Sequence, residues 1–171
     1  GVINILRQMG ANIVLSNELD VGGEPVADVR VRYAPLKGIT IPEDQVPLAI
    51  DEFPAIFIAA ACAEGTTILS GAEELRVKES DRIQSMADGL VILGIDAQPT
   101  VDGICILGGQ LGSGSVHSHD DHRIAMAFAI AALRASGEII VLDCNNVGTS
   151  FPDFVGLAGQ IGINLTSETM S

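Results

Sequence analysis

Two apolar stretches of this chain carry no polar side chain, and they constrain the fold more than any other feature. Residues 124–133 read IAMAFAIAAL and residues 56–63 read IFIAAACA, so neither has the polar face of a surface helix. Each is also shorter than the roughly 18 residues that a membrane span needs. We therefore expect both to be helices buried on all sides with strands outside them, whereas an ordinary doubly wound sheet would bury the strands and expose the helices.

Three segments share one ending, a helical pattern that stops at a glycine and continues as a strand. They are LRQMGANI at 6–13, VILGIDA at 91–97 and GQIGINL at 159–165. Glycine readily adopts the left-handed conformation that commonly ends a helix. An internal repeat is the economical explanation, with loops of different length between the copies.

The rest of the pattern fills these copies in the order strand, helix, strand, helix, strand, strand. The sequence therefore predicts an α/β fold of repeated βαβαββ units, with buried parallel helices inside and sheets outside. The glycine-rich stretch GGQLGSGS at 108–115 is expected to be a flexible loop, because no Gly-Lys-Ser/Thr follows it as in a phosphate loop. We expect strands at 13–16, 26–33, 39–41, 66–70, 97–101, 104–107, 138–143 and 163–166, and helices at 54–63, 81–93, 122–136 and 152–161.

The composition excludes several classes of protein. With 47% hydrophobic and 18% charged residues among 171, the chain is expected to fold. Its three cysteines include no CxxC pair and do not suit a disulfide scaffold. A net charge of −13 argues against nucleic acid as a partner, and no membrane span or signal peptide is visible. Because Gly1 stands inside a helical pattern, we expect the chain to begin partway through a larger protein.

The scarce basic residues gather at one place in the chain. The segment LRVKESDR at 75–82 places Arg76, Lys78 and Arg82 within seven residues, although the whole chain has only nine basic residues. In an acidic protein such a group indicates a site for a small anion. The alternative is that these cations form ion pairs with neighbouring carboxylates at the surface.

The same segment has the signature of a helix start. Ser80 is a good N-cap and Asp81 suits the first turn, so the free N–H groups and the positive end of the helix dipole would face an anion beside the cations. Glu79 stands among these charges and could exchange a proton with a bound ligand. The alternative is a capped helix with ordinary surface ion pairs.

The segment HSHDDHR at 117–123 contains all three histidines of the chain. By letters it fits the H-x-H-x-D-H pattern of a zinc hydrolase, but such a two-metal site needs further histidines downstream. The better interpretation makes Asp120 or Asp121 the N-cap of the apolar helix, with Arg123 in its first turn. His122 is then either a proton donor or simply a hydrogen-bonded side chain.

The segment IDEFP at 50–54 opens the other apolar helix. Pro54 belongs in a first helical turn, which places Asp51 at or next to the N-cap, where a carboxylate commonly does no more than cap. Asp51 and Asp121 occupy matching points of the repeat. If the helices are parallel, the helix starts converge into one anion-binding face that holds candidate carboxylates for proton transfer.

Four motifs resemble the 5-enolpyruvylshikimate-3-phosphate synthase family. They are IDEFP (50–54), LRVKESDR (75–82), DHRIAM (121–126) and TSFPDF (149–154), and the similarity covers essentially the whole chain. The related UDP-N-acetylglucosamine enolpyruvyl transferase shares the fold but not LRVKESDR and DHR. The resemblance implies a two-domain protein with three βαβαββ units in each domain. Residues 1–171 look like about two units and part of a third, from the C-terminal domain.

The resemblance also implies a reaction. The family transfers the enolpyruvyl group of phosphoenolpyruvate to the 5-hydroxyl of shikimate 3-phosphate and releases phosphate, without a metal or other cofactor. By motif matching, Asp51 takes the place of the general base on that hydroxyl, and Glu79 is a candidate for proton transfer at the methylene carbon. For substrate binding, Lys78 would contact shikimate 3-phosphate, Arg82 and Arg123 would hold phosphoenolpyruvate, and Asp121 and His122 would be further members of the site.

The sequence departs from the family pattern in two respects. Many members have a lysine just before the SFPD-like segment, where Thr149 stands here, so sensitivity to the inhibitor glyphosate is left open. The other half of the site, from an N-terminal domain of the same parent chain, is missing from residues 1–171, so the chain alone is expected not to catalyse. The resemblance implies a cytoplasmic enzyme of the shikimate pathway of aromatic amino-acid biosynthesis. A noncatalytic anion-binding or regulatory domain is the competing hypothesis.

Overall fold

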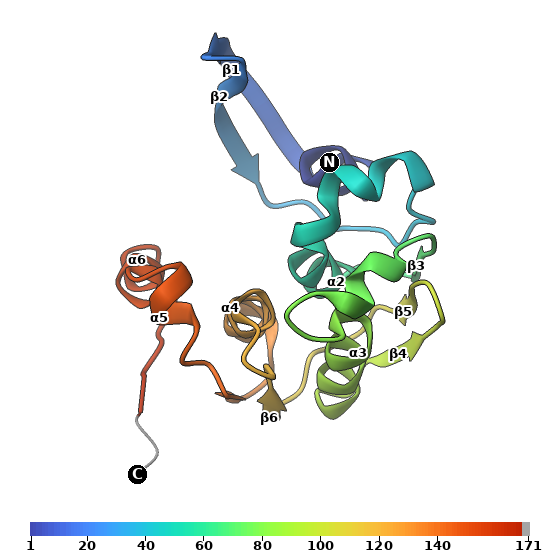
Figure 1. Cartoon of the computed structure of the whole chain (residues 1–171), viewed down its shortest axis with the longest axis vertical. Helices are drawn as coiled ribbons and strands as arrows, with labels where there is room; N and C mark the ends of the chain where they lie inside the picture. The colour runs from blue at the N-terminus through green and yellow to red at the C-terminus, as the bar shows by residue number, and fades with distance from the viewer. Residues whose placement is uncertain (169–171) are drawn as a thin grey trace.

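The longer helices of this chain pack together in its interior, and the sheets lie around them (Figure 1). The computed structural model describes residues 1–168. No helix in that range combines the length and apolar character needed to cross a membrane. With η marking 3₁₀ helices, the elements are α1 (Val2–Gln8), β1 (Asn12–Val21), β2 (Glu24–Arg32), η1 (Glu43–Gln45), η2 (Pro47–Glu52), α2 (Phe53–Ala61), β3 (Thr66–Leu69), η3 (Glu73–Val77), α3 (Arg82–Ile92), β4 (Asp96–Pro99), β5 (Ile104–Leu107), β6 (Gly114–His117), α4 (His122–Ala131), η4 (Ala132–Arg134), β7 (Ile139–Leu142), α5 (Val147–Ser150) and α6 (Phe154–Gln160).

Three small sheets form within the described residues. β1 and β2 make an antiparallel ribbon that projects from the rest of the chain (Figure 1). The second sheet is antiparallel with the order β3-β5-β4, and the third is the parallel pair of β6 and β7. Since the second and third sheets pack on helices that lie between them, the predicted α/β class with helices inside is confirmed.

The three repeated glycines end their helices as the sequence predicts. Gly10, Gly94 and Gly162 adopt positive φ angles of 96°, 84° and 89°, which a side chain would disfavour. The strand predicted after the last of them, at 163–166, is wrong. No described segment pairs with it there, and a strand exists only where a partner satisfies its backbone hydrogen bonds.

Two other predicted segments differ in the structure. The predicted strand at 39–41 forms only an isolated bridge to β3, because Pro42 follows at once and cannot donate a ladder hydrogen bond. The predicted loop at 108–115 ends in β6, whose first N–H donates to the carbonyl of Glu138 at 3.1 Å. The partner of β6 lies more than twenty residues later, so a local pattern could not reveal it.

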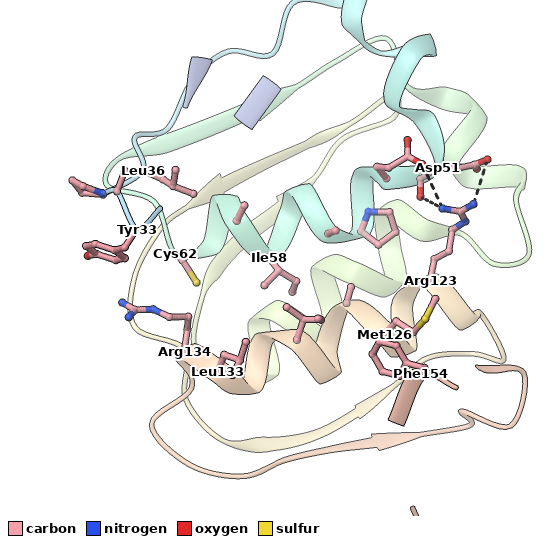
Figure 2. A pocket seen from close by; sticks show the side chains of 18 residues that line it. Tyr33, Leu36, Asp51, Ile58, Cys62, Arg123, Met126, Leu133, Arg134 and Phe154 are labelled. Carbon is pink, nitrogen blue, oxygen red and sulfur yellow. Dashed lines mark hydrogen bonds and ion pairs between the residues drawn. The ribbon is translucent and has the colours of Figure 1, made fainter. Parts of the chain in front are cut away.

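Helices α2, α3 and α4 contact one another, and α2 is buried over most of its surface. The expectation of burial on all sides is wrong for α4. Ile130 is 41% exposed, and Leu133 in the following η4 is 56% exposed. Both line a groove of about 600 Å³ between α2 and α4, which the described residues leave open (Figure 2). The apolar surface of α4 therefore exceeds what this chain covers.

Gly89 marks the closest approach of α3 to α4, because an added Cβ would overlap the ring of Phe128. We expect Gly89→Ala to lower the free energy of unfolding by about 1–3 kcal/mol through overpacking, although alanine is the better helix former. Gly156→Ala in α6 is the matched control, since its Cβ would meet nothing within 4 Å. That change should raise stability by about 0.5–1 kcal/mol. Urea unfolding measures both, and shifts of the same sign would contradict the packing account.

Candidate active site

Arg82, the first residue of α3, is the centre of the site. Its side chain is only 1% exposed, yet all of its guanidinium nitrogens reach carboxylates. Nε donates to Asp121 Oδ2 at 2.8 Å, NH1 to Asp51 Oδ1 at 3.0 Å and NH2 to Glu79 Oε2 at 2.5 Å. The structure therefore brings together residues that are up to 70 positions apart in the sequence, as the predicted convergence of helix starts requires.

Asp121 holds this arginine from the start of α4. It is the N-cap of the helix, where its Oδ1 accepts from the backbone N–H of Arg123 at 3.0 Å and of Ile124 at 3.4 Å. Burial by itself would raise the pKa of Asp121. The hydrogen bond and charge of Arg82, together with the two backbone N–H groups, lower that pKa below its ordinary value. One buried carboxylate thus caps one helix and fixes a cation of another.

The start of α3 differs from the prediction by one residue. The N-cap is Asp81, whose Oδ1 accepts from the N–H of Gln84 at 3.0 Å, and not Ser80. A carboxylate has a second oxygen, and here it pairs with Arg76 at 2.6 Å, which a serine cap could not do. Ser80 instead donates its hydroxyl to Asp121 Oδ2 at 3.1 Å.

Asp51 lies in η2 immediately before α2 and does not cap that helix. The N-cap position belongs to Glu52, and no side chain forms a capping hydrogen bond there. The nearest cations to the Asp51 carboxylate are Arg82 at 3.0 Å, Lys78 Nζ at 3.6 Å and Arg123 NH2 at 3.9 Å. Asp51 is therefore not a helix cap, and the position of its carboxylate is explained by the three cations that converge on it.

The environment of Asp51 keeps it ionised. Partial burial would raise its pKa, but the charges of Arg123 and Lys78 and the hydrogen bond from Arg82 lower the pKa below its ordinary value. The side chain is 42% exposed. It can therefore accept a proton from a ligand hydroxyl at neutral pH.

Lys78 and Glu79 occupy the loop between η3 and α3. Lys78 forms ion pairs with Asp51 and with Glu74, and the hydrogen bond that Lys78 donates to Glu74 is the main reason that the pKa of Lys78 is raised. The Glu79 side chain is 51% exposed, and its carboxylate contacts Arg82. The pair with Glu74 is one of the ion pairs with neighbouring carboxylates that the sequence offers as an alternative, and its (i, i+4) spacing is a recognised signal for such a pair.

Arg123 is the accessible cation of the site. Its side chain is 36% exposed, and NH1 donates to the backbone carbonyl of Asp51 at 3.0 Å (Figure 2). NH1 also lies 3.6 Å from Glu52 Oε1, a partner that the sequence analysis did not single out. His122, the first residue of α4, is half-buried beside Asp121.

Arg76 does not belong to the anion site, although the sequence analysis grouped it with Lys78 and Arg82. Its Nε donates to the carbonyl of Val101 at 2.7 Å and its NH2 to the carbonyl of Thr100. With NH1 on Asp81, every nitrogen of this guanidinium has a protein acceptor.

The zinc alternative finds no support in the donor geometry. Residues 1–168 contain no group of three or more His, Cys, Asp or Glu side chains arranged to hold a metal ion. His117 Nδ1 lies 2.8 Å from Asp143 Oδ2 at the end of β6, and the ring of His119 is 5.9 Å from that of His117. Both histidines are exposed, and within residues 1–168 neither forms a hydrogen bond or ion pair with a residue of the Arg82 cluster.

The family model of EPSP synthase (3-phosphoshikimate 1-carboxyvinyltransferase) matches residues 1–157. The chain belongs to this family. It is 66% identical over 165 residues to a protein of Methylococcus capsulatus and 68% identical over 163 residues to one of Nitrosococcus oceani, both named 3-phosphoshikimate 1-carboxyvinyltransferase. These alignments cover 96% and 95% of this chain but only 38% and 37% of those proteins.

A solved structure of EPSP synthase from Acinetobacter baumannii has the same fold. It superposes on 98% of this chain with a TM-score of 0.94 at 57% sequence identity. The match covers 40% of that longer chain. The enolpyruvyl transferase fold expected from the motifs is therefore confirmed, and the chain corresponds to about two fifths of such a protein.

The buried pair of Asp121 and Arg82 yields a test of stability against pH. Because the pKa of Asp121 is lower in the folded chain than in the unfolded one, its ionisation stabilises the fold above about pH 4, and this contribution is lost as the pH falls through the lowered value. We expect Asp121→Asn to cost about 3–5 kcal/mol at pH 7, as for other broken buried pairs, and the cost to shrink in acid.

Asp120→Asn is the matched control for that substitution. Asp120 is exposed and adopts a left-handed φ of 58°, which asparagine tolerates well. We expect it to change stability by less than about 0.5 kcal/mol. Urea unfolding at several pH values measures both variants, and an Asp121→Asn cost that does not vary with pH would contradict the assignment.

Proposed function

We propose that the full-length protein containing this chain transfers the enolpyruvyl group of phosphoenolpyruvate to the 5-hydroxyl of shikimate 3-phosphate and releases phosphate. The observation that supports this most directly is the ionised Asp51, which has Lys78, Arg82 and Arg123 within 4 Å. Both substrates are anions, and the reaction needs a base beside them. The relatives named 3-phosphoshikimate 1-carboxyvinyltransferase support the same proposal.

In this proposal Asp51 is the general base that removes the proton of the 5-hydroxyl. A base positioned at the nucleophile contributes about 10²–10⁴-fold to such a step. The cations around Asp51 keep it ionised, and its exposed edge leaves room for the hydroxyl. Glu79, half-exposed on the loop before α3, would move a proton at the methylene carbon of phosphoenolpyruvate.

The cations divide between the two substrates. Lys78 would contact the phosphate of shikimate 3-phosphate, while Arg82 and Arg123 would hold phosphoenolpyruvate by charge-assisted hydrogen bonds. Arg82 contacts Asp51 and Glu79, and an incoming anion would replace these contacts. Asp121 keeps Arg82 in place throughout, since their contact is buried. His122 stands beside them as a further contact to the substrates.

The site of this chain is open on one side, which supports a two-domain arrangement. Asp51, Glu79 and Arg123 are 42%, 51% and 36% exposed, and water weakens each of their electrostatic interactions several-fold. The chain spans about two fifths of the length of its relatives. We propose that residues 1–171 belong to the C-terminal domain and that an N-terminal domain of the same parent chain closes the site and excludes water.

Two finer expectations stay predictions. A cytoplasmic location follows only from the family resemblance. Glyphosate is a candidate inhibitor, and the exposed Thr149 in α5 occupies the place where many members have a lysine. The competing hypothesis of a noncatalytic anion-binding domain makes a different prediction from ours, because it expects ligand binding without phosphate release by the full-length protein.

Phosphate release from phosphoenolpyruvate and shikimate 3-phosphate tests the proposed activity. The full-length protein should release phosphate only when both substrates are present. The isolated 171-residue chain should release none, and adding the missing part of the protein in trans should restore turnover. A full-length protein that binds both anions without turnover would establish the competing hypothesis, and turnover by the chain alone would refute the two-domain site.

Asp51→Asn in the full-length protein tests the base. The amide preserves the shape of the side chain but cannot accept the proton, so turnover should fall at least about 10²-fold with near-normal KM values. Asp88→Asn, an exposed aspartate on α3, serves as the control and should retain full activity. Steady-state kinetics decide the matter, since an Asp51→Asn variant of normal turnover would leave Asp51 without a catalytic role.

A further inference from the structure

Arg76 is the one arginine of the LRVKESDR segment that faces the protein and not the site. Its side chain is 27% exposed, and its fork grips the turn between β4 and β5 through the carbonyls of Val101 and Thr100. Its remaining nitrogen pairs with Asp81 at 2.6 Å. Unlike Arg82, Arg76 makes no hydrogen bond or ion pair with Asp51, Glu79 or Asp121 in residues 1–168, so its contacts need an explanation other than substrate binding.

The pairing with Asp81 closes a short loop of the chain. Residues 77–80 run from the end of η3 to the N-cap of α3, and Arg76 and Asp81 join the two ends of this segment. Lys78 and Glu79 are the charged side chains on it. The position of both candidate site residues therefore depends on how firmly these ends are joined.

The turn that Arg76 grips is itself fastened to the same region. Asp102 accepts from the N–H of Gly71 with its Oδ2 at 2.9 Å, and its backbone carbonyl accepts from the N–H of Ala72 at 2.7 Å. The next residue, Gly103, packs so close to the carbonyl of Leu69 that a Cβ would overlap it. The β4–β5 turn is thus a fixed platform beneath η3, although it lies about 25 residues away in the sequence.

Arg82 is held by different contacts. Its anchor is the buried Asp121 at the start of α4, and this pair involves neither Arg76 nor the β4–β5 turn. Glu79 and Ser80 of the loop also contact this pair, but the anchor of Arg82 on Asp121 is direct and buried. Loosening the loop at 77–80 would therefore move Lys78 and Glu79 more than Arg82. Arg123 on α4 is likewise independent of the turn. The site therefore has two halves: Lys78 and Glu79 depend on the loop at 77–80, whereas Arg82 and Arg123 depend on α4.

We propose that Arg76 is a positioning residue that locks the loop at 77–80 onto the β4–β5 turn and so places Lys78 and Glu79 against the substrate. The proposal rests on the proposed function for the roles of those two residues. It assigns Arg76 to the half of the site that serves shikimate 3-phosphate and proton transfer. The contacts that Arg82 and Arg123 would make with phosphoenolpyruvate do not depend on Arg76.

The test compares Arg76→Gln with Arg7→Gln in the full-length protein. Arg7 is a matched control, because its Nε and NH2 also donate to a backbone carbonyl, that of Ile13, at 3.1 Å. We expect Arg76→Gln to lower kcat/KM for shikimate 3-phosphate by about 10–100-fold, the usual cost of a misplaced group. The KM for phosphoenolpyruvate should change by less than about twofold, as for an untouched contact. Arg7→Gln should alter neither.

Two further variants separate positioning from general damage. Asp81→Ser keeps the helix cap, since serine caps as well as aspartate, but it leaves Arg76 without its anion. It should show the same kinetic pattern as Arg76→Gln. Arg76→Lys should restore only part of the loss, because an ammonium can pair with Asp81 but cannot grip two carbonyls as a fork does. Arg123→Gln should show the opposite pattern, with KM raised for phosphoenolpyruvate and not for shikimate 3-phosphate.

Amide hydrogen exchange gives a readout that does not depend on activity. In Arg76→Gln and Asp81→Ser, peptides covering 77–80 should exchange about tenfold faster or more, whereas those from the middle of α3 should not change. Unchanged exchange at 77–80, or an equal rise in KM for both substrates, would overturn the proposal. If the unmodified full-length protein shows no transferase activity, the proposed function fails, and the exchange comparison still decides whether Arg76 locks the loop.

Discussion

The ion pair between Arg82 and Asp121 is the contact on which the rest of the site depends. Both side chains are almost fully buried, and charges removed from water are tolerated only when they are paired and hydrogen-bonded. Asp121 meets that condition by capping α4 and binding Arg82 at once, and Arg82 meets it with three carboxylates. The pair therefore joins the starts of two helices and points the remaining donors of Arg82 toward Asp51 and Glu79.

The apolar helices explain why such a site can form. α2 and α4 bury most of their surface. Charged side chains can therefore gather at the polar starts of these helices without being buried. The same helices leave a groove along Ile130 and Leu133 that no residue in 1–168 fills. An uncovered apolar groove beside a half-open charged site is what one expects of a chain that spans about two fifths of its relatives.

The basic residues of this acidic chain have two distinct uses. Arg76 and Arg82 contact protein acceptors with every nitrogen, and they fix the loop and the helix start on which the site is built. Lys78 and Arg123 are more accessible and are balanced by carboxylates that an anion could replace. A net charge of −13 makes this concentration of cations informative, because an anion would be repelled elsewhere.

The sequence by itself determined the α/β class, the three glycine helix ends, the apolar helices and, through four motifs, the family. It also identified Asp51, Lys78, Glu79, Arg82, Asp121 and Arg123 as a group. Only the tertiary structure decided that Asp81 and not Ser80 caps α3, that Asp51 caps nothing, and that Arg76 grips a turn. Caps, parallel strand partners such as β6 with β7, and arginine acceptors are chosen by neighbours distant in sequence. Periodicity and motifs record only local preference, so they cannot specify those neighbours.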